Sequence, residues 1–271
     1  MPHNLFLVLT YLGAAYVGSQ VQKNGITIQE LLDKALGRLF GGEKIKTVFA
    51  GRTDSGVHAW GQGVTARVAK LIPPAKVLAA LNSLLPRDIR VRSARYAGTG
   101  FQPRYDARSR EYLYNIYYGA EPLLYLLDRV WHIDARQRLD WRLMRRAARL
   151  FKGTHDFSAF CAAGSAARDK TRRVKVSEIT ARRVYRWPGA RQKADGMLLT
   201  YRIKADGFLY HMVRNIVAAL AAVGLGKMTV AELRDVLRGR SRSALKAPTA
   251  PAAGLVLYDV LYWARESKEK C

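Results

Sequence analysis

The sequence is poor in cysteine and in acidic side chains, and it has no long uninterrupted apolar run. Its two cysteines, Cys161 and Cys271, offer neither a disulfide framework nor the spacing of a metal-binding pair. This favours a reducing compartment, and we expect a cytoplasmic protein. The five histidines show no ligand spacing and no carboxylates cluster, so we also expect no metal.

The apolar stretches are too short to cross a membrane. The most apolar stretch, residues 216–225, contains Gly224 and lies between Arg214 and Lys227, whereas a membrane-spanning helix needs about 20 apolar residues. The segment Met1–Asn4 lacks the basic character of a signal peptide. Phosphate-binding loops of the P-loop type and dinucleotide-binding fingerprints are missing as well. We therefore expect no segment within a membrane and no cofactor.

Basic residues dominate the charge of the chain. Lysine and arginine number 46, aspartate and glutamate number 21, and the formal net charge is +25. Such an excess goes beyond what solubility requires and predicts a polyanionic partner, nucleic acid or a membrane surface. The excess is +8 in residues 1–100 and +17 in residues 101–271, so it belongs to the folded body and not to a tail.

The first hundred residues alternate between strand and helix patterns. Thr27 and Glu30 form a capping box before a helical apolar spacing that ends at Gly41-Gly42, and Pro74 begins a second helix. The predicted elements are strands 5–12, 45–50, 62–68 and 89–96 and helices 28–39 and 74–85. The order β-α-β-β-α-β predicts a ferredoxin-like fold, which is an antiparallel sheet covered by two helices.

The rest of the chain predicts a second α/β domain of the same general kind. Its expected elements are strands 110–118, 130–133, 171–182, 197–205 and 254–263, a helix from 140 to a stop at Gly153, and helices 209–223 and 229–237. The small and basic stretch 161–173 is an expected loop, with RNA contact and plain solvation as even alternatives.

A break at residues 98–103 separates the two parts, so we expect domains at 1–103 and 104–265 and a polar tail at 266–271. The predicted fold class is α/β of the α+β type. It consists of two ferredoxin-like (RRM-like) domains with antiparallel sheets flanked by helices and an active-site cleft between them.

Asp54 is an acidic side chain in a glycine-bounded loop of this basic chain, within the sequence Ala-Gly-Arg-Thr-Asp-Ser-Gly-Val-His of residues 50–58. A turn or a helix cap is the ordinary interpretation, because Asp, Ser and Gly favour turns. A loop between two strands can also lift a side chain into a cleft. There an ionised carboxylate can take part in chemistry.

Two residues of the second half are further candidates. Arg214 lies in a mostly apolar helical segment, 208–217, and burying an unpaired guanidinium is costly. Asp54 is the partner that we expect, and an arginine whose head reaches water is the alternative. Tyr112 shares one face of an expected strand with Arg110 and further tyrosines. Strand propensity explains most of these tyrosines, but one beside a cleft can stack on an extruded base or move a proton.

The segment Gly51–His58 resembles the active-site signature of the TruA-type tRNA pseudouridine synthases. Seven shorter segments match the same family in the same order: Tyr16-x-Gly18-x-Gln20-x-Gln22, Thr27-x-Gln29-Glu30, Phe101-x-x-Arg104-x-x-Ala107, Arg110-x-Tyr112-x-Tyr114, His155-Asp156-Phe157-x-x-Phe160, His211-Met212-Val213-Arg214-Asn215 and Ala250-Pro251-x-x-Gly254-Leu255. Two positions depart from the family. Ser19 replaces a common tryptophan, and Gln102-Pro103 replaces the usual His-Ala.

The resemblance implies an enzyme that isomerises uridine to pseudouridine at positions 38, 39 and 40 of the tRNA anticodon arm, without cofactor or metal. Asp54 would be the essential aspartate and would pair with Arg214. Tyr112 would stack on the target uracil and assist removal of its C5 proton.

The resemblance also implies the partners of the protein. Arg52, Arg110 and His58 would contact the substrate, and a homodimer would hold tRNA, with no role for DNA. A rival hypothesis from another class is a non-catalytic basic RNA-binding protein, for which two sheet domains and a basic surface suffice.

Overall fold

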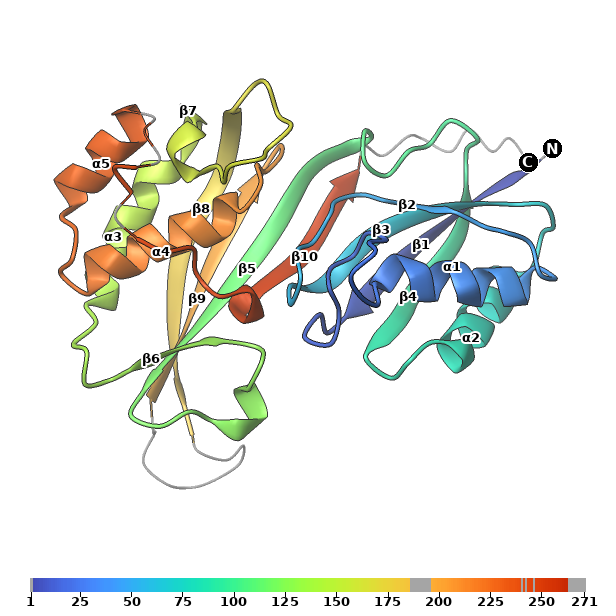
Figure 1. Cartoon of the computed structure of the whole chain (residues 1–271), viewed down its shortest axis with the longest axis horizontal. Coiled ribbons are helices and arrows are strands. Elements are labelled where there is room, and N and C mark those ends of the chain that lie inside the picture. The colour runs from blue at the N-terminus through green and yellow to red at the C-terminus, as the bar shows by residue number, and fades with distance from the viewer. Residues whose placement is uncertain (1, 186–195, 240, 242, 246, 263–271) are drawn as a thin grey trace, which may run out of the picture. The chain divides into compact units, whose positions relative to one another are not determined.

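The computed structural model describes residues 2–185, 196–239, 241, 243–245 and 247–262 (Figure 1). The chain divides into two compact units, Met1–Arg110 with Leu257–Cys271, which we call the N unit, and Glu111–Val256, which we call the C unit. The expected tail at 266–271 lies outside the described residues. Among those that are described, no helix is both long enough and apolar enough to cross a membrane.

The N unit has the element order that its sequence pattern predicts. Its elements are β1 (His3–Tyr11), α1 (Ile28–Leu39), β2 (Thr47–Phe49), β3 (His58–Val68), α2 (Pro74–Leu84) and β4 (Ile89–Ala97). Strand β1 lies between β4 and β3, β2 also pairs with β3, and all three pairings are antiparallel. This is the ferredoxin-like arrangement.

Local signals explain why the helices of the N unit begin where they do. Thr27 Oγ1 accepts the backbone N–H of Glu30 at 3.2 Å and so satisfies one of the free donors at the start of α1. Pro74 opens α2, where the missing N–H costs nothing. Figure 1 shows both helices on one face of the N-unit sheet. The core between these helices and the sheet contains fully buried aliphatic side chains: Leu5, Leu7, Leu9, Leu32, Leu36, Val77 and Leu81.

The C unit contains a sheet with the strand order β5-β9-β8-β7, and β6 runs parallel to β5. Two strands belong to both units: β5 (Ala107–Gly119) passes from the N unit into the C unit, and β10 (Leu255–Tyr262) passes from the C unit into the N unit. The other strands of the C unit are β6 (Trp131–Asp134), β7 (Gly153–Asp156), β8 (Thr171–Val184) and β9 (Gly196–Ala205). The helices are α3 (Trp141–Ala148), α4 (Met212–Gly224) and α5 (Val230–Gly239), with four short 3-10 helices, η1 (Leu124–Leu126), η2 (Arg149–Phe151), η3 (Ser158–Phe160) and η4 (Ala252–Gly254).

Two details of the C unit correct the sequence analysis. Gly153, expected only as a helix stop, opens the unexpected strand β7 with a φ of +116°, which glycine adopts without strain. Strand β8 begins at Thr171, as expected, so the last three residues of the stretch 161–173 belong to this strand and pair with β7. The helix expected from residue 209 begins at Met212, since His211 has a left-handed backbone with φ +57°.

Helix α4 is the most deeply buried helix element that the structure describes in the C unit. Every residue of α4 except Arg214 is buried, and α3 packs against it. Asn215 anchors the helix: its Nδ2 donates to Phe160 O at 2.8 Å, and its Oδ1 accepts from Thr249 Oγ1 at 2.8 Å. These bonds fix the first turn of α4, which carries Arg214.

Candidate active site

The structure distributes the candidate residues over both units. The N unit carries Arg52, Asp54, His58 and Arg110, and the C unit carries Tyr112 and Arg214. The surroundings of each set follow from contacts within its own unit.

Asp54 lies in the segment between β2 and β3. Its backbone C=O accepts the N–H of Val57 at 3.1 Å, and Gly56 closes this turn with a φ of +77°. The Asp54 side chain is partly exposed, whereas Thr53 beside it is buried. The loop thus holds the backbone in the fold and leaves the carboxylate in reach of solvent.

Thr53 is fixed at its backbone and at its side chain. Its N–H donates to Ser19 Oγ at 2.9 Å, its C=O accepts the Ser19 N–H at 3.0 Å, and its Oγ1 lies 2.8 Å from the Tyr11 hydroxyl. Ser19 is 1% exposed. Burial raises the pKa of Tyr11 to about 12, against the opposing effect of its hydrogen bonds with Thr53 and Gln62. The residue next to Asp54 therefore has little freedom.

The beginning of the loop is held from two further sides. The fully buried Gln62 side chain donates to Gly51 O at 2.7 Å and accepts from Gly51 N at 3.3 Å. The Arg110 guanidinium donates to Ala50 O through Nε at 3.2 Å and Nη2 at 2.8 Å. Arg110, expected to contact the substrate, thus supports the backbone of the loop.

His58 and Gly13 hold the end of the loop. The buried His58 ring accepts the Gly13 N–H at Nδ1, at 2.9 Å. A side chain at Gly13 has no room, because an added Cβ would lie 2.0 Å from Val57 O. Tyr16 O accepts from Ser55 Oγ at 3.2 Å, and the Tyr16 hydroxyl donates to Asp88 Oδ1 at 2.7 Å.

Gln102, one of the departures from the family pattern, belongs to a turn that precedes β5. Its N–H donates to Asp106 Oδ2 at 2.7 Å, and its C=O accepts the Asp106 N–H at 2.9 Å. Ser19, the other departure, supports the Asp54 loop. Both departures therefore lie at positions that fix the backbone.

In the C unit, Arg214 is held at the start of α4. Its Nε donates to Ala250 O at 2.7 Å, its backbone C=O accepts the Ala250 N–H at 3.4 Å, and its Nη1 lies 3.4 Å from His211 Nε2. These contacts fix the stem of the side chain. Arg214 is half-buried.

Two tyrosines of β5, Tyr112 and Tyr114, are held by contacts within the C unit, and Tyr114 lies near this arginine. The Tyr112 ring is 8% exposed and contacts Phe208 edge-on, with centroids 4.9 Å apart. Tyr114 donates its hydroxyl to Pro251 O at 2.7 Å. Burial raises the pKa of Tyr114, and the nearby Arg214 charge acts in the opposite direction. One region of the C unit thus brings together β5, the start of α4 and residues 250–251.

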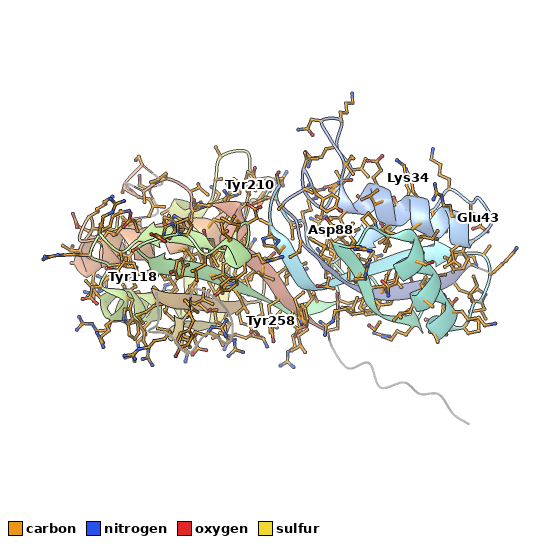
Figure 2. All side chains as sticks on the ribbon, turned by 90° about the horizontal axis from the view of Figure 1, so that it is seen from below. Lys34, Glu43, Asp88, Tyr118, Tyr210 and Tyr258 are labelled. Carbon is orange, nitrogen blue, oxygen red and sulfur yellow. The ribbon has the colours of Figure 1, made fainter. Side chains whose placement is uncertain are left out.

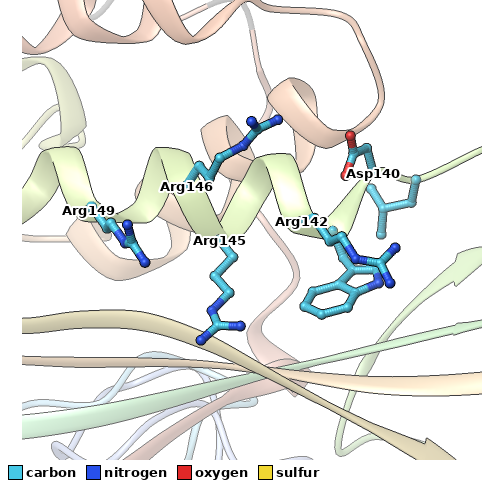
Figure 3. Close-up of a pocket in the computed structure, with 7 residues that line it drawn as sticks. Asp140, Arg142, Arg145, Arg146 and Arg149 are labelled. Atoms are coloured by element: carbon cyan, nitrogen blue, oxygen red, sulfur yellow. The ribbon is translucent and has the colours of Figure 1, made fainter.

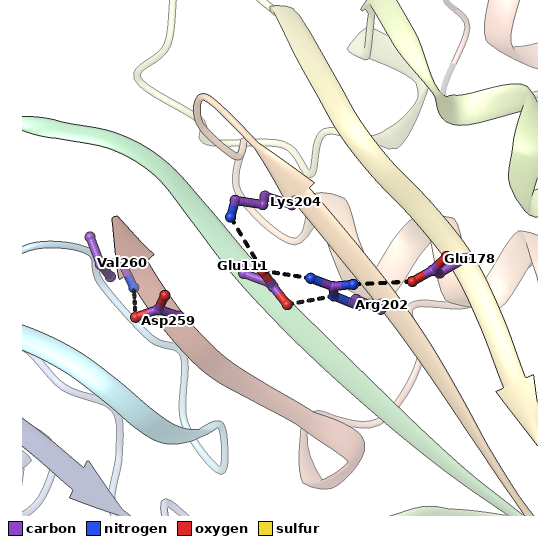
Figure 4. Close-up of polar contacts among 6 residues, drawn as sticks. All are labelled: Glu111, Glu178, Arg202, Lys204, Asp259 and Val260. Atoms are coloured by element: carbon purple, nitrogen blue, oxygen red, sulfur yellow. Dashed lines mark hydrogen bonds and ion pairs between the residues drawn. The ribbon is translucent and has the colours of Figure 1, made fainter. Parts of the chain in front are cut away.

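A charge network ties β5 to β9 beside Tyr112. The nearly buried Glu111 carboxylate accepts from Arg202 Nε at 2.6 Å and lies 3.6 Å from Lys204 Nζ, and Arg202 also lies 3.2 Å from the exposed Glu178 (Figure 4). Glu111 precedes Tyr112 in the strand and points to the other face of the sheet. This network fixes the register of the strand that carries Tyr112.

Sequence reasoning missed four of these supporting side chains: Tyr11, Gln62, Phe208 and Glu111. The available signal was Gln62, a glutamine within an expected strand, because a polar side chain that becomes buried needs partners. The described residues contain no group of three or more His, Cys, Asp or Glu side chains placed to hold a metal ion.

Comparison with known proteins agrees with these features. The profile of the family described as "tRNA pseudouridine synthase" matches residues 7–106 and 147–263. Relatives named "tRNA pseudouridine synthase A" include those of Shouchella clausii, 39% identical, covering 94% of this chain and 91% of the relative, and Acetivibrio thermocellus, 37% identical, covering 96% and 99%. A third, from Syntrophomonas wolfei, is 39% identical and covers 94% and 96%.

The fold and the signature loop define an α+β protein of the kind that modifies RNA. The chain belongs to the tRNA pseudouridine synthase family, whose members are isomerases of uridine in tRNA.

Proposed function

We propose that this chain converts uridine to pseudouridine at positions 38, 39 and 40 of the tRNA anticodon arm. Family membership supports the reaction, and the net charge of +25 supports a polyanionic substrate. The observation that carries the proposal is the Asp54 loop. Thr53, the neighbour of Asp54, is held by hydrogen bonds from its backbone and its side chain, yet Asp54 itself stays partly exposed.

The reaction breaks the bond between uracil N1 and ribose C1′ and forms a bond between C5 and C1′. The C5 proton leaves, and a proton is gained at N1, so the product is an isomer of the substrate. Asp54 engages the ribosyl or uracil moiety after the nucleotide has left its stack. A braced loop suits this role, because a preorganised charge costs no rearrangement in the transition state.

Arg214 and Tyr112 complete the proposed catalytic set. Arg214 would pair with Asp54 and orient the carboxylate, since a guanidinium presents donors in a fixed geometry. Tyr112 would stack on the uracil and assist removal of its C5 proton. The bonds that fix Arg214 through Ala250, and the packing of Tyr112 on Phe208, support roles that need exact placement.

Arg52, exposed at the start of the loop, would hold the flipped nucleotide or the space that it leaves. The contacts of His58 with Gly13 and of Arg110 with Ala50 favour a loop-holding role for both residues over direct contact with the substrate. We further propose that the protein acts in the cytoplasm as a homodimer, in which paired basic surfaces hold the tRNA.

The test uses tRNA labelled with tritium at uracil C5, because rejoining through C5 must expel that atom. The parent protein should release tritium to water, and Asp54→Asn should abolish release while leaving the Kd for tRNA within a few-fold, since phosphate contacts dominate affinity. Glu43→Gln, which removes the same charge elsewhere in the N unit, is the matched control (Figure 2). Release by Asp54→Asn at the parent rate would refute the role of Asp54. Tight binding without release by any form would favour the RNA-binding protein.

A further inference from the structure

The outer side of α3 and the start of the adjoining η2 carry four arginines in one stripe, which we call the α3 arginine stripe. Arg142, Arg145 and Arg146 belong to α3, and Arg149 is the first residue of η2. All four are exposed, and their spacing of 3, 1 and 3 residues places them within one helical face. Figure 3 shows them along α3, with Asp140 at its beginning. They line an open hollow of about 700 Å³ together with Leu139, Asp140 and Trp141.

The opposite side of α3 provides the packing contacts of this helix, whereas the arginine stripe does not. Met144, Ala147 and Ala148 are buried, and α3 packs through them against α4 and β8. None of the four arginines forms an ion pair with another residue that the structure describes. Asp140, the acidic neighbour, is engaged as the helix cap, where it accepts the Leu143 N–H at 2.9 Å.

Like charges three and four residues apart on a helix repel one another. The negative end of the helix dipole stabilises the two arginines nearest the end of α3, but each is still repelled by a second arginine. Helix α5 of the same unit shows the ordinary pattern, because its exposed Arg234 and Arg238 alternate with Glu232 and Asp235. The stripe on α3 is therefore a concentration of positive charge with no internal use.

We propose that the α3 arginine stripe binds the phosphodiester backbone of the RNA substrate, at phosphates other than the one of the reacting nucleotide. The proposal rests on the proposed function for the identity of the RNA. Four exposed arginines on one helical face offer several donors to successive phosphates, to which arginine donates in a bidentate manner. The Arg142 guanidinium lies 5.1 Å from the centre of the Trp141 ring, which limits its freedom before binding.

The stripe would bind the RNA backbone and not the bases. Phosphate contacts position a nucleic acid without reading its sequence, and they make affinity depend on salt. Removal of one arginine–phosphate interaction should lower the slope of log Kd against log salt by about 0.7–0.9 and raise the Kd at about 0.1 M salt roughly five- to eightfold.

The experiment compares two double variants, each with two arginines one helical turn apart. Arg142→Gln/Arg146→Gln removes two charges from α3, and Arg234→Gln/Arg238→Gln removes two from α5. The Kd for full-length tRNA is measured between 50 and 300 mM salt, roughly the range over which phosphate contacts dominate. We expect the α3 variant to raise the Kd and flatten the slope, the α5 variant to behave as the parent, and Arg142→Lys/Arg146→Lys to recover most of the slope.

Equal slopes for the α3 variant and the parent, or equal losses in the α3 and α5 variants, would overturn the proposal. Unchanged thermal midpoints exclude misfolding as the cause. Binding to vesicles of anionic phospholipid that is lost in the α3 variant, with tRNA binding intact, would assign the stripe to a membrane and also overturn it. Tritium release at saturating tRNA separates the two proposals: absence of release from the parent refutes the proposed function, while the binding comparison still decides the role of α3.

Discussion

Substitution of Ser19 by alanine tests whether the backbone beside Asp54 needs an acceptor from outside the loop. Ser19 Oγ accepts the Thr53 N–H at 2.9 Å in a site where Ser19 is 1% exposed. Alanine removes the acceptor and leaves a buried N–H without a partner, which costs about 1–3 kcal/mol. The Ser19 N–H bond to Thr53 O survives the change, so the loop should loosen and not detach.

We expect Ser19→Ala to lower the free energy of unfolding by that amount and to speed amide hydrogen exchange in residues 50–57. The value of kcat should fall by roughly tenfold to a hundredfold, because a displacement of about 1 Å at a catalytic group has an effect of this size. The KM for tRNA should stay within a few-fold, since affinity resides in phosphate contacts.

Ser55→Ala is the matched control, since it makes the same chemical change two residues after Thr53. Ser55 is exposed and its Oγ donates to Tyr16 O, which also accepts the Gly56 N–H at 3.3 Å. Its loss should therefore change stability by no more than about 0.5 kcal/mol. Equal losses in the two variants, or a KM that rises in step with a falling kcat in Ser19→Ala, would refute the positioning role of Ser19.

Three further predictions follow from buried and crowded groups. The Tyr11 hydroxyl has a pKa near 10 in the unfolded chain and about 12 in the fold. Its contribution to stability is therefore complete below pH 10, and about 2–3 kcal/mol is lost as the pH rises to 12. In urea unfolding, Tyr11→Phe should lose less stability over this alkaline range than the parent. Glu111→Gln should destabilise by about 1–2 kcal/mol, since it breaks a nearly buried pair with a half-exposed arginine, while Glu178→Gln, 52% exposed, should stay within about 0.5 kcal/mol in the same assay. Gly13→Ala should cost about 1–3 kcal/mol in thermal unfolding, because its Cβ would displace Val57 O.

The N unit was predictable because each of its elements carries a local signal. The Thr27 capping box, Pro74 and the pair Gly41-Gly42 act within one helical turn of their own positions, so no knowledge of tertiary contacts is needed. The strand order then follows from the β-α-β-β-α-β sequence, which leaves few antiparallel arrangements that can cover one face with both helices.

The C unit was less predictable because its details depend on distant partners. Strand β7 has four residues and exists through pairing with β8, which begins 15 positions after β7 ends. The late start of α4 depends on His211, whose left-handed backbone is uncommon for any residue other than glycine, although histidine adopts it more often than most.

The candidate site shows where sequence reasoning stops and why. Motifs identify Asp54, but the group that holds Thr53 lies 34 residues earlier in the chain, at a position known from the sequence only as a departure from the family. The substitution has a physical consequence that the structure makes clear. A serine both donates and accepts, whereas the tryptophan common at this position only donates. Ser19 can therefore meet the Thr53 N–H directly, and in this chain Ser19→Trp would overfill a buried site and leave that N–H without an acceptor.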